Sequence, residues 1–327
     1  KMVSYYEAFA RGGFGLLITE GIYPDTAHSQ GYLFQPGIAT KEQAQAWEKV
    51  VEAVHGAGAK IFAQLMHAGS QTQGNRFVDS TIGPSAVAPK GEQLGFYRGQ
   101  GPYRVPEEIT AEQLEEVRQG FVSAALRARD AGFDGVEIHG ANGYLLDQFL
   151  TDYLNERTDQ YGGSPENRVR FAAEIARAVR EAVGPDFTVG IRISQAKVSD
   201  NDHTWAGGAQ EAEVIFSTLA ATGIDFIHTT EYRAYAPAFG EEGLSLAALA
   251  KQHSGLPVIA NGHLDDPETA SSLIAEEAAD VVALGKAALG NRDWPHRVRN
   301  NLPLDEVDGR LFAPVADVKN WELELLS

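Results

Sequence analysis

The chain has 327 residues, of which 43% are apolar, and its formal net charge at neutral pH is −18. Clustered Lys and Arg are needed to hold nucleic-acid phosphates or an anionic membrane surface, so this acidic balance argues against nucleic acid and membrane as partners. There is no cysteine, which excludes disulfides and cysteine-ligated iron–sulfur clusters.

Targeting signals are absent from the sequence as it stands. No signal peptide precedes the first helical segment, and no apolar run reaches the length of a membrane span. We therefore expect a cytoplasmic protein. The oligomeric state is left open, with a homo-oligomer among the possibilities.

Segments with strand and helix patterns alternate along the whole chain. Short apolar runs predict seven strands, at 14–20, 60–66, 135–139, 187–193, 225–230, 256–260 and 280–284. Helical spacing of apolar residues predicts helices at 2–11, 42–55, 110–131, 165–183, 209–222, 245–253 and 267–276, with a last one after Gly285. Such alternation is typical of parallel strands joined by crossover helices.

The fold class that this alternation predicts is α/β, and specifically a (β/α)8 TIM barrel in a single domain, 1–327. A doubly wound sheet is disfavoured because no G-x-G-x-x-G motif follows the first strand. The barrel lacks its first strand, because 2–11 has a helical pattern where a barrel begins with a strand, so we expect the chain to be clipped at its N-terminus. The region 67–108, rich in Gly, Pro and Gln, is expected to form an extended loop or cap after the third barrel strand.

Three proton-handling side chains follow one another where strand 135–139 ends. His139 is the last residue of that strand, and Asn142 and Tyr144 come shortly after it. Barrel active sites lie at the carboxyl ends of the strands. The His Nε2–H and the Asn amide can donate to an oxygen that gains negative charge, and a tyrosine phenol suits a general acid. The alternative is a structural role, with His139 satisfied at the strand end and Tyr144 packed in the core.

The stretch that begins at His139 is the most distinctive in the chain. "HGANGYLLDQFL" followed by "NERTDQYGGSPENRVRF" resembles the old yellow enzyme family of FMN-dependent ene-reductases. The segments "GLLITEG", "FAQLMHAG", "GIRIS", "VIANG" and "DVVALGKAAL" are similar to that family's second, third, fifth, seventh and eighth strands. The resemblance implies a TIM barrel that holds FMN across its mouth, with NADH or NADPH as the reductant.

The resemblance also implies a role for each member of the His–Asn–Tyr set. NAD(P)H reduces the FMN and leaves, and an α,β-unsaturated carbonyl compound, the activated alkene, takes its place. His139 and Asn142 hold the carbonyl oxygen, hydride passes from the flavin to the β-carbon, and Tyr144 protonates the α-carbon. Hydride transfer requires such a cofactor because no side chain carries a hydride.

Two polar residues within apolar strands are candidates for contact with the cofactor. A buried amide such as Gln64 must be paired, and a buried charge such as Arg192 is costly without an anionic partner. The resemblance implies that Gln64 contacts the pyrimidine edge of the flavin and that Arg192 lies near its N1 and O2. It also implies that Gly21 lets the backbone approach the ring. For Gln64, a hydrogen bond to a neighbouring strand is the alternative.

The phosphate of the cofactor is expected beyond the last two strands, where barrels commonly bind phosphate. Gly262 offers backbone N–H groups at a helix start, as do Gly285 and Lys286. Lys286 stands where the family usually has Arg, and it lacks the bidentate fork of a guanidinium. In the family, the first strand supplies further flavin contacts, and no residue of this sequence can be assigned to them.

Two other classes of protein remain open. A cofactor-free barrel lyase or aldolase would need a Schiff-base lysine or a metal site at a strand end. Lys60 lies at the wrong end of its strand, and Lys197 is expected in a loop. A non-catalytic barrel that binds flavin would not need the His139, Asn142 and Tyr144 set. The absence of cysteine argues against the dienoyl-CoA reductase branch of the family, which carries an iron–sulfur site.

Overall fold

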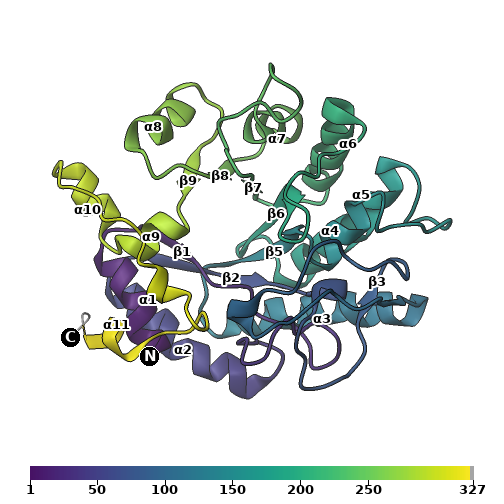
Figure 1. The fold of residues 1–327 in the computed structure, drawn as a ribbon, viewed down its shortest axis with the longest axis horizontal. Coiled ribbons are helices and arrows are strands. Elements are labelled where there is room, and N and C mark those ends of the chain that lie inside the picture. The colour runs from purple at the N-terminus through teal and green to yellow at the C-terminus, as the bar shows by residue number, and fades with distance from the viewer. Residues whose placement is uncertain (325–327) are drawn as a thin grey trace.

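The strands form one curved, open sheet. The computed structural model describes residues 1–324, and seven strands lie side by side in the order β1-β2-β5-β6-β7-β8-β9. They are β1 (Leu16–Ile18), β2 (Lys60–Leu65), β5 (Gly135–Asn142), β6 (Thr188–Lys197), β7 (Phe226–Thr230), β8 (Val258–Asn261) and β9 (Val281–Ala283). Every neighbouring pair is parallel. The sheet curls into part of a barrel with helices outside it (Figure 1), so the predicted α/β barrel architecture is confirmed.

The predicted helices are all present, and three short ones were not expected. The expected helices are α1 (Met2–Arg11), α2 (Lys41–Gly56), α3 (Ala111–Asp130), α5 (Pro165–Val183), α6 (Gly208–Ala220), α7 (Leu246–Ser254), α8 (Pro267–Ala275) and α9 (Lys286–Gly290). The additional ones are α4 (Leu145–Leu150), α10 (Trp294–Arg299) and α11 (Asn320–Glu324). Within residues 1–324, no helix is both long enough and apolar enough to cross a membrane.

Two strands at the centre of the sheet are longer than the sequence predicts. β5 continues past His139 to Asn142, and β6 continues to Lys197. The two extensions pair with each other beyond a bulge, with Asn142 opposite Lys197. The prediction that Lys197 lies in a loop is therefore wrong. A bulge of this kind bends a strand at the rim of a barrel without ending its pairing, and the apolar pattern does not reveal it.

The region 67–108 contains more regular structure than an extended loop. Two short strands in it, β3 (Ile82–Gly83) and β4 (Glu107–Glu108), form a separate two-stranded sheet. Two 3-10 turns, η1 (Gly69–Gln71) and η2 (Gly95–Tyr97), lie in the same region. Arg157 Nη1 donates to the carbonyl oxygens of Pro84 and Ile109, each at 3.1 Å, and so ties this cap to the loop after α4.

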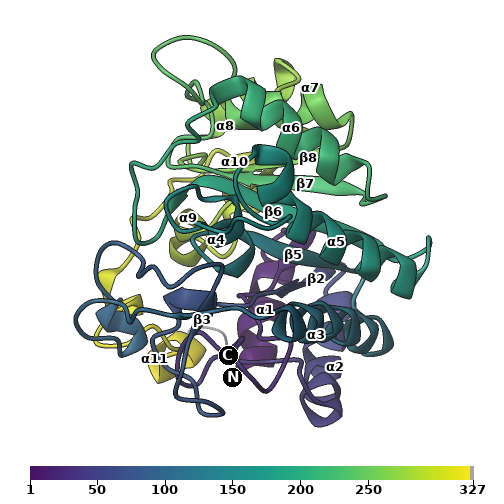
Figure 2. The same ribbon diagram turned by 90° about the vertical axis from the view of Figure 1, so that its right-hand side faces the viewer.

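The sheet has two open edges, β1 and β9, and no other strand among residues 1–324 bridges them. The N-terminus and the C-terminal segment lie side by side near these edges (Figures 1 and 2). Lys1 Nζ donates to the carbonyl oxygen of Val318 at 3.1 Å, and Arg292 forms an ion pair with Glu322 at 2.6 Å. The C-terminal segment thereby forms part of the wall beside the open side of the sheet.

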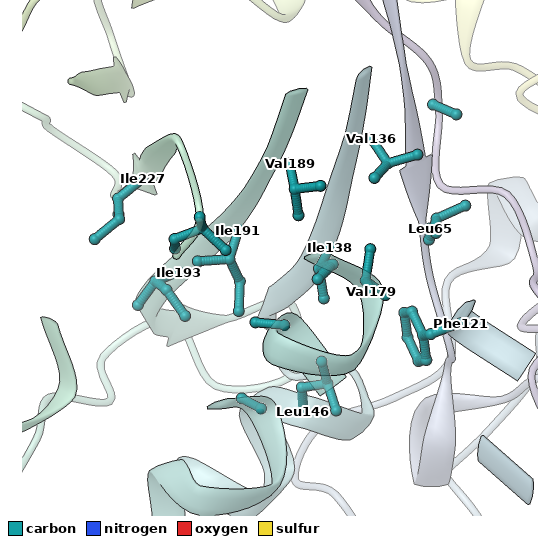
Figure 3. Close-up of a cluster of buried hydrophobic side chains, with 14 of the residues drawn as sticks. Leu65, Phe121, Val136, Ile138, Leu146, Val179, Val189, Ile191, Ile193 and Ile227 are labelled. Atoms are coloured by element: carbon teal, nitrogen blue, oxygen red, sulfur yellow. The ribbon is translucent and has the colours of Figure 1, made fainter. Parts of the chain in front are cut away.

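The core lies between the outer face of the sheet and the helices (Figure 3). Alternate side chains of a strand point to opposite faces, so residues two apart share a face. On β5 and β6 the outward positions are filled by fully buried aliphatic residues: Val136, Ile138, Val189, Ile191 and Ile193. They pack against helix residues that include Phe121 of α3, Leu146 of α4 and Val179 of α5. The intervening positions of these strands face the barrel interior, where the polar side chains lie.

Phe121 is fully buried in this core and offers a direct test of it. Phe121→Ala is expected to lower the free energy of unfolding by about 3–5 kcal/mol, because it loses apolar burial and leaves a cavity. Urea denaturation followed by circular dichroism measures the change. Val105→Ala is the control, because Val105 is 66% exposed, and its effect should stay within about 0.5 kcal/mol. Similar losses in both variants would contradict this description of the core.

Candidate active site

A row of polar side chains crosses the inner face of the sheet. The strand register places Gln64 of β2 beside Glu137 of β5. It also places His139 of β5 beside Arg192 of β6, and Arg192 beside His228 of β7. All five belong to strand positions that alternate with the outward-facing apolar ones, which is why they gather on one face.

A buried carboxylate joins part of this row. Glu137 is fully buried, and its two oxygens accept hydrogen bonds from Gln64 Nε2 and His228 Nδ1, both at 2.7 Å. Burial favours the neutral acid, but His228, Arg192 and Gln64 outweigh it and lower the pKa of Glu137 to about 2. Glu137 is therefore ionised. Burial lowers the pKa of His228, so its neutral ring donates through Nδ1 and leaves Nε2 as an acceptor.

His139 is a neutral hydrogen-bond donor. Burial, together with the positive charge of Arg192, lowers the pKa of His139 to about 3. Its Nδ1 accepts the N–H of Ala141 at 3.3 Å, which places the ring proton on Nε2. Nε2 forms no hydrogen bond with a described residue. The rings of His139 and Tyr144 meet edge to face, with centroids 4.9 Å apart, so the structure brings these two predicted site residues into contact.

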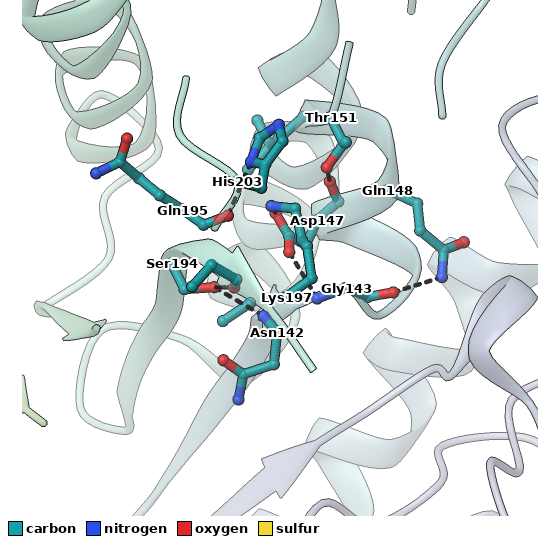
Figure 4. Close-up of polar contacts among 12 residues, drawn as sticks. Asn142, Gly143, Asp147, Gln148, Thr151, Ser194, Gln195, Lys197 and His203 are labelled. Atoms are coloured by element: carbon teal, nitrogen blue, oxygen red, sulfur yellow. Dashed lines mark hydrogen bonds and ion pairs between the residues drawn. The ribbon is translucent and has the colours of Figure 1, made fainter. Parts of the chain in front are cut away.

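Asn142 is held in an uncommon backbone conformation. Its φ is +62°, a left-handed geometry that Asn tolerates better than most residues. Its N–H donates to Ser194 Oγ at 2.8 Å, and its carbonyl oxygen accepts from Val198 N–H at 3.1 Å and Gln71 Nε2 at 3.0 Å. The side-chain amide makes no hydrogen bond within residues 1–324, and it points away from the polar contacts drawn around it (Figure 4).

A buried ion pair lies directly behind this turn. Lys197 Nζ and Asp147 Oδ1 are 2.7 Å apart, and both side chains are 0% exposed. The other oxygen of Asp147 accepts the N–H of Gly143 at 2.6 Å, and Gln148 Nε2 donates to the Gly143 carbonyl at 2.7 Å (Figure 4). All backbone polar groups of Asn142 and Gly143 are thus bonded, so the turn that presents Asn142 and Tyr144 is fixed. Because the Lys197 amine is enclosed with Asp147, it is not available to form a Schiff base.

A cleft of about 970 Å³ opens between the edges β1 and β9. Four of the predicted cofactor residues line it: Gln64, Arg192, Gly285 and Lys286. Gly21 and Gly262 do not line it, and neither do His139, Asn142 and Tyr144. Tyr144 instead lines a separate space of about 10 Å³.

Gly21 and Gly262 each have a packing reason to be glycine. A Cβ on Gly21 would lie 2.5 Å from Met66 Sδ. Gly262 has φ +139°, and a Cβ there would lie 2.0 Å from the carbonyl oxygen of Glu231. A role for either residue next to the flavin stays a prediction.

Asn261 is a cleft residue that the sequence analysis missed. Its Oδ1 accepts from Arg192 Nη2 at 3.0 Å and from Thr230 Oγ1 at 2.8 Å, while its Nδ2 donates to the carbonyl oxygen of Ala283 at 2.9 Å. It therefore joins β8 to β6, β7 and β9. The only signal in the sequence was a polar residue directly at the end of an apolar strand.

The residues of the cleft fit a flavin nucleotide. Arg192 Nε and His228 Nε2 are buried without a hydrogen-bond partner, and both residues line the cleft. A buried group of this kind calls for a partner, and the edge of a flavin ring offers both acceptors and an N–H donor. The walls near β1 are aromatic and aliphatic, with Phe14 and Leu16 among them, and suit a flat ring system. Lys286 at the mouth is exposed and can meet a phosphate.

A parallel barrel with such a cleft at its strand ends has the features of a flavin-dependent oxidoreductase. The sequence profile of the NADH:flavin oxidoreductase / NADH oxidase family matches residues 1–305, and the chain belongs to that family. It is an NAD(P)H-dependent flavin oxidoreductase with FMN as its cofactor.

Similar proteins agree with this assignment. NADH oxidase of Thermoanaerobacter brockii is 36% identical over 91% of this chain, which spans only 45% of that longer protein. 12-Oxophytodienoate reductase 1 of Oryza sativa subsp. japonica is 36% identical over 94% of this chain and 79% of its own length. The structure of an old yellow enzyme homologue from Zymomonas mobilis is 29% identical, with a TM-score of 0.85, and the match covers 96% of this chain and 86% of that chain. The resemblance to the old yellow enzymes is confirmed.

Lys197→Met is expected to lower the free energy of unfolding by about 3–5 kcal/mol, because it leaves the buried Asp147 without its partner. Lys197→Met combined with Asp147→Asn should lose less, since both charges are removed while an acceptor for Gly143 N–H remains. Urea denaturation at neutral pH measures both.

The control for this prediction is Lys251→Met, because Lys251 forms its ion pair with Asp280 where both side chains are about one-third exposed. Its cost should be below about 1 kcal/mol. If Lys197→Met costs no more than Lys251→Met, the buried pair does not support the turn as described.

Proposed function

We propose that the protein reduces the C=C bond of α,β-unsaturated carbonyl compounds with NAD(P)H, at a site formed by His139, Asn142 and Tyr144. The observation that carries this proposal is the state of His139. Its ring is neutral, its Nε2–H has no partner within the described residues, and it meets the ring of Tyr144 at the carboxyl end of β5. Such a donor beside a phenol suits a substrate that gains negative charge on oxygen and needs a proton on carbon.

The cleft residues would hold the cofactor. Arg192 and Gln64 would face the ring edge, and Lys286 with the backbone at Gly285 would meet the phosphate. Gly262 and Gly21 do not line the cleft, and the resemblance alone supports a place for them beside the phosphate and the ring. When bound, FMN accepts hydride from NADH or NADPH and supplies it to the alkene. Arg192 is the residue suited to balance negative charge there, because its guanidinium has no ion-pair partner among residues 1–324 and remains charged in proteins.

His139 and Asn142 would bind the carbonyl oxygen of the substrate. The pKa of about 3 keeps His139 neutral throughout the physiological range, so it polarises the carbonyl as a hydrogen-bond donor and does not protonate it. The amide of Asn142 is free to add a second donor, and its backbone is already fixed by Ser194 and Val198. Fixed donors of this kind need no reorganisation when charge develops on the oxygen.

Tyr144 would supply the proton to the α-carbon. Burial raises the pKa of Tyr144 well above its usual value, so the phenol keeps its proton at neutral pH. A group that is protonated at the working pH and enclosed near the reacting carbon can act as the general acid.

The absorbance spectrum of the purified protein, with FMN added if needed, tests the cofactor and its reduction together. We expect flavin bands that bleach when NADH or NADPH is added without oxygen, and that return when an activated alkene is added. A protein that stays colourless after incubation with FMN would contradict the proposal. Bands that bleach but do not recover with any activated alkene would limit the activity to flavin reduction.

Tyr144→Phe separates the two halves of the proposed reaction. Alkene reduction should slow by about 10²- to 10⁴-fold, because general-acid catalysis is lost, while flavin reduction by NAD(P)H should keep its rate. Stopped-flow absorbance measures each half separately. Tyr235→Phe is the matched control, since Tyr235 is exposed on the loop after β7, and it should leave both rates unchanged. Equal loss of both rates in Tyr144→Phe would refute the role of Tyr144 as the acid.

A further inference from the structure

The bulge in β6 holds the backbone of Asn142 from two sides. The pairing of β5 with β6 shifts directly before Asn142, which pairs with Lys197, because β6 has extra residues there. Ser194 Oγ, at the start of the bulge, accepts the N–H of Asn142 at 2.8 Å. The N–H of Val198, just past its end, donates to the carbonyl oxygen of Asn142 at 3.1 Å. The shape of the bulge therefore sets the backbone conformation of Asn142.

This backbone conformation depends on contacts around it. Asn142 has a φ of +62°, which strains any residue except glycine, although asparagine tolerates it better than most. Such a conformation persists only where the surrounding structure fixes it. The side-chain amide of Asn142 extends from this backbone, so a change in the bulge would displace the donor that the proposed reaction offers to the substrate oxygen.

Glu231 holds the middle of the bulge. It comes directly after β7, and its Oε1 accepts the N–H of Gln195 at 2.7 Å. His203 Nδ1 donates to the carbonyl oxygen of the same residue at 2.9 Å (Figure 4). Ser194 Oγ closes the bulge by donating to the carbonyl oxygen of Ala196 at 2.7 Å. Gln195 is only 1% exposed, so loss of the Glu231 carboxyl would leave a buried N–H without a partner.

The side chain and the backbone of Glu231 contact different parts of the site. The backbone N–H donates to the carbonyl oxygen of Asn261 at 3.0 Å, and the side chain of Asn261 accepts from Arg192 in the cleft. The carboxyl contacts the bulge instead. A substitution of Glu231 therefore changes the support of the bulge and leaves the backbone contact with β8 in place.

Resting on the proposed function, we propose that Glu231 is a positioning residue for carbonyl binding: its side-chain oxygen fixes the β6 bulge, and the bulge fixes the amide of Asn142. Burial raises the pKa of Glu231 to about 7, so both protonation states are populated near neutral pH. In each state a carboxyl oxygen keeps a lone pair for the N–H of Gln195. The role therefore requires an acceptor in this place and does not require the charge.

Binding of cyclohex-2-enone to the oxidised, FMN-loaded protein tests this role. The change in flavin absorbance gives the dissociation constant. Glu231→Leu should weaken binding by about 2- to 12-fold, the worth of one hydrogen bond, because the Asn142 amide is no longer aligned. Glu231→Gln retains an acceptor oxygen and should keep the dissociation constant within about twofold. Unchanged binding in Glu231→Leu, or equal weakening in both variants, would overturn the proposal.

Glu231→Asp separates the place of the acceptor from its charge. It keeps the carboxylate but draws the oxygens back by one methylene, so it should weaken enone binding although the charge remains. It also replaces Glu231→Leu in the test if that variant does not fold. The affinity for FMN is the control, and it should stay within about twofold in every variant, because the backbone contact with Asn261 is kept.

Ser194→Ala shows whether the effect reaches Asn142 through the bulge. It removes the acceptor for the N–H of Asn142, so it should weaken enone binding in the same way as Glu231→Leu. Because both changes act on one connection, the double variant should bind within about twofold of the weaker single variant. Effects that multiply, as those of independent sites do, would contradict this connection.

Amide hydrogen exchange gives a readout that needs neither the cofactor nor the reaction. Glu231→Leu should speed exchange in the peptides that contain Gln195 and Asn142, and leave exchange over 60–65 of β2 unchanged. If exchange responds in this way but the wild-type protein neither binds nor reduces the enone, the proposed function fails and the positioning role stands. If the wild-type protein reduces the enone but Glu231→Leu changes neither exchange nor binding, the positioning role fails and the reaction stands.

Discussion

The structure depends on the register of four adjacent parallel strands. Parallel pairing with side chains alternating between faces gives β2, β5, β6 and β7 one mainly aliphatic face, which packs on the helices. The same register aligns Gln64, Glu137, Arg192 and His228 on the other face. A shift of one residue in any of these strands would bury polar groups against the helices and turn the aliphatic side chains into the cleft.

The ionised groups inside the barrel are tolerated because each is paired or faces the cleft. Glu137 is held by two donors, and Asp147 is paired with Lys197. Such interior pairs are poor sources of net stability, because desolvation offsets much of their attraction. The pair of Asp147 and Lys197 instead fixes the position of the turn after β5, since Asp147 also accepts the N–H of Gly143. The charges left without a partner, above all Arg192, are those that line the cleft.

The proposed cofactor site and the proposed acid are adjacent but separated in this structure. Gln64 and Arg192 line the large cleft, while Tyr144 lines the small pocket. The rings of Tyr32 and Tyr97 line both spaces, and each ring comes from a different loop. The wall between the two spaces is thus built from loops, whereas His139 and Asn142 of the proposed site lie on β5 and Tyr144 follows directly after it.

The sequence by itself determined the class of the fold and the family. Apolar runs located all seven strands because each strand presents buried aliphatic residues to the helices at alternate positions, and the run from His139 to Phe171 identified the old yellow enzymes. Only the tertiary structure decided the pairing of Lys197 with Asp147, the contacts of Asn261, and the stack of Tyr32 on Tyr97. These contacts join residues far apart in the chain. They depend on strand register, on a bulge that extends β5 and β6, and on loop packing, and local residue patterns encode none of these.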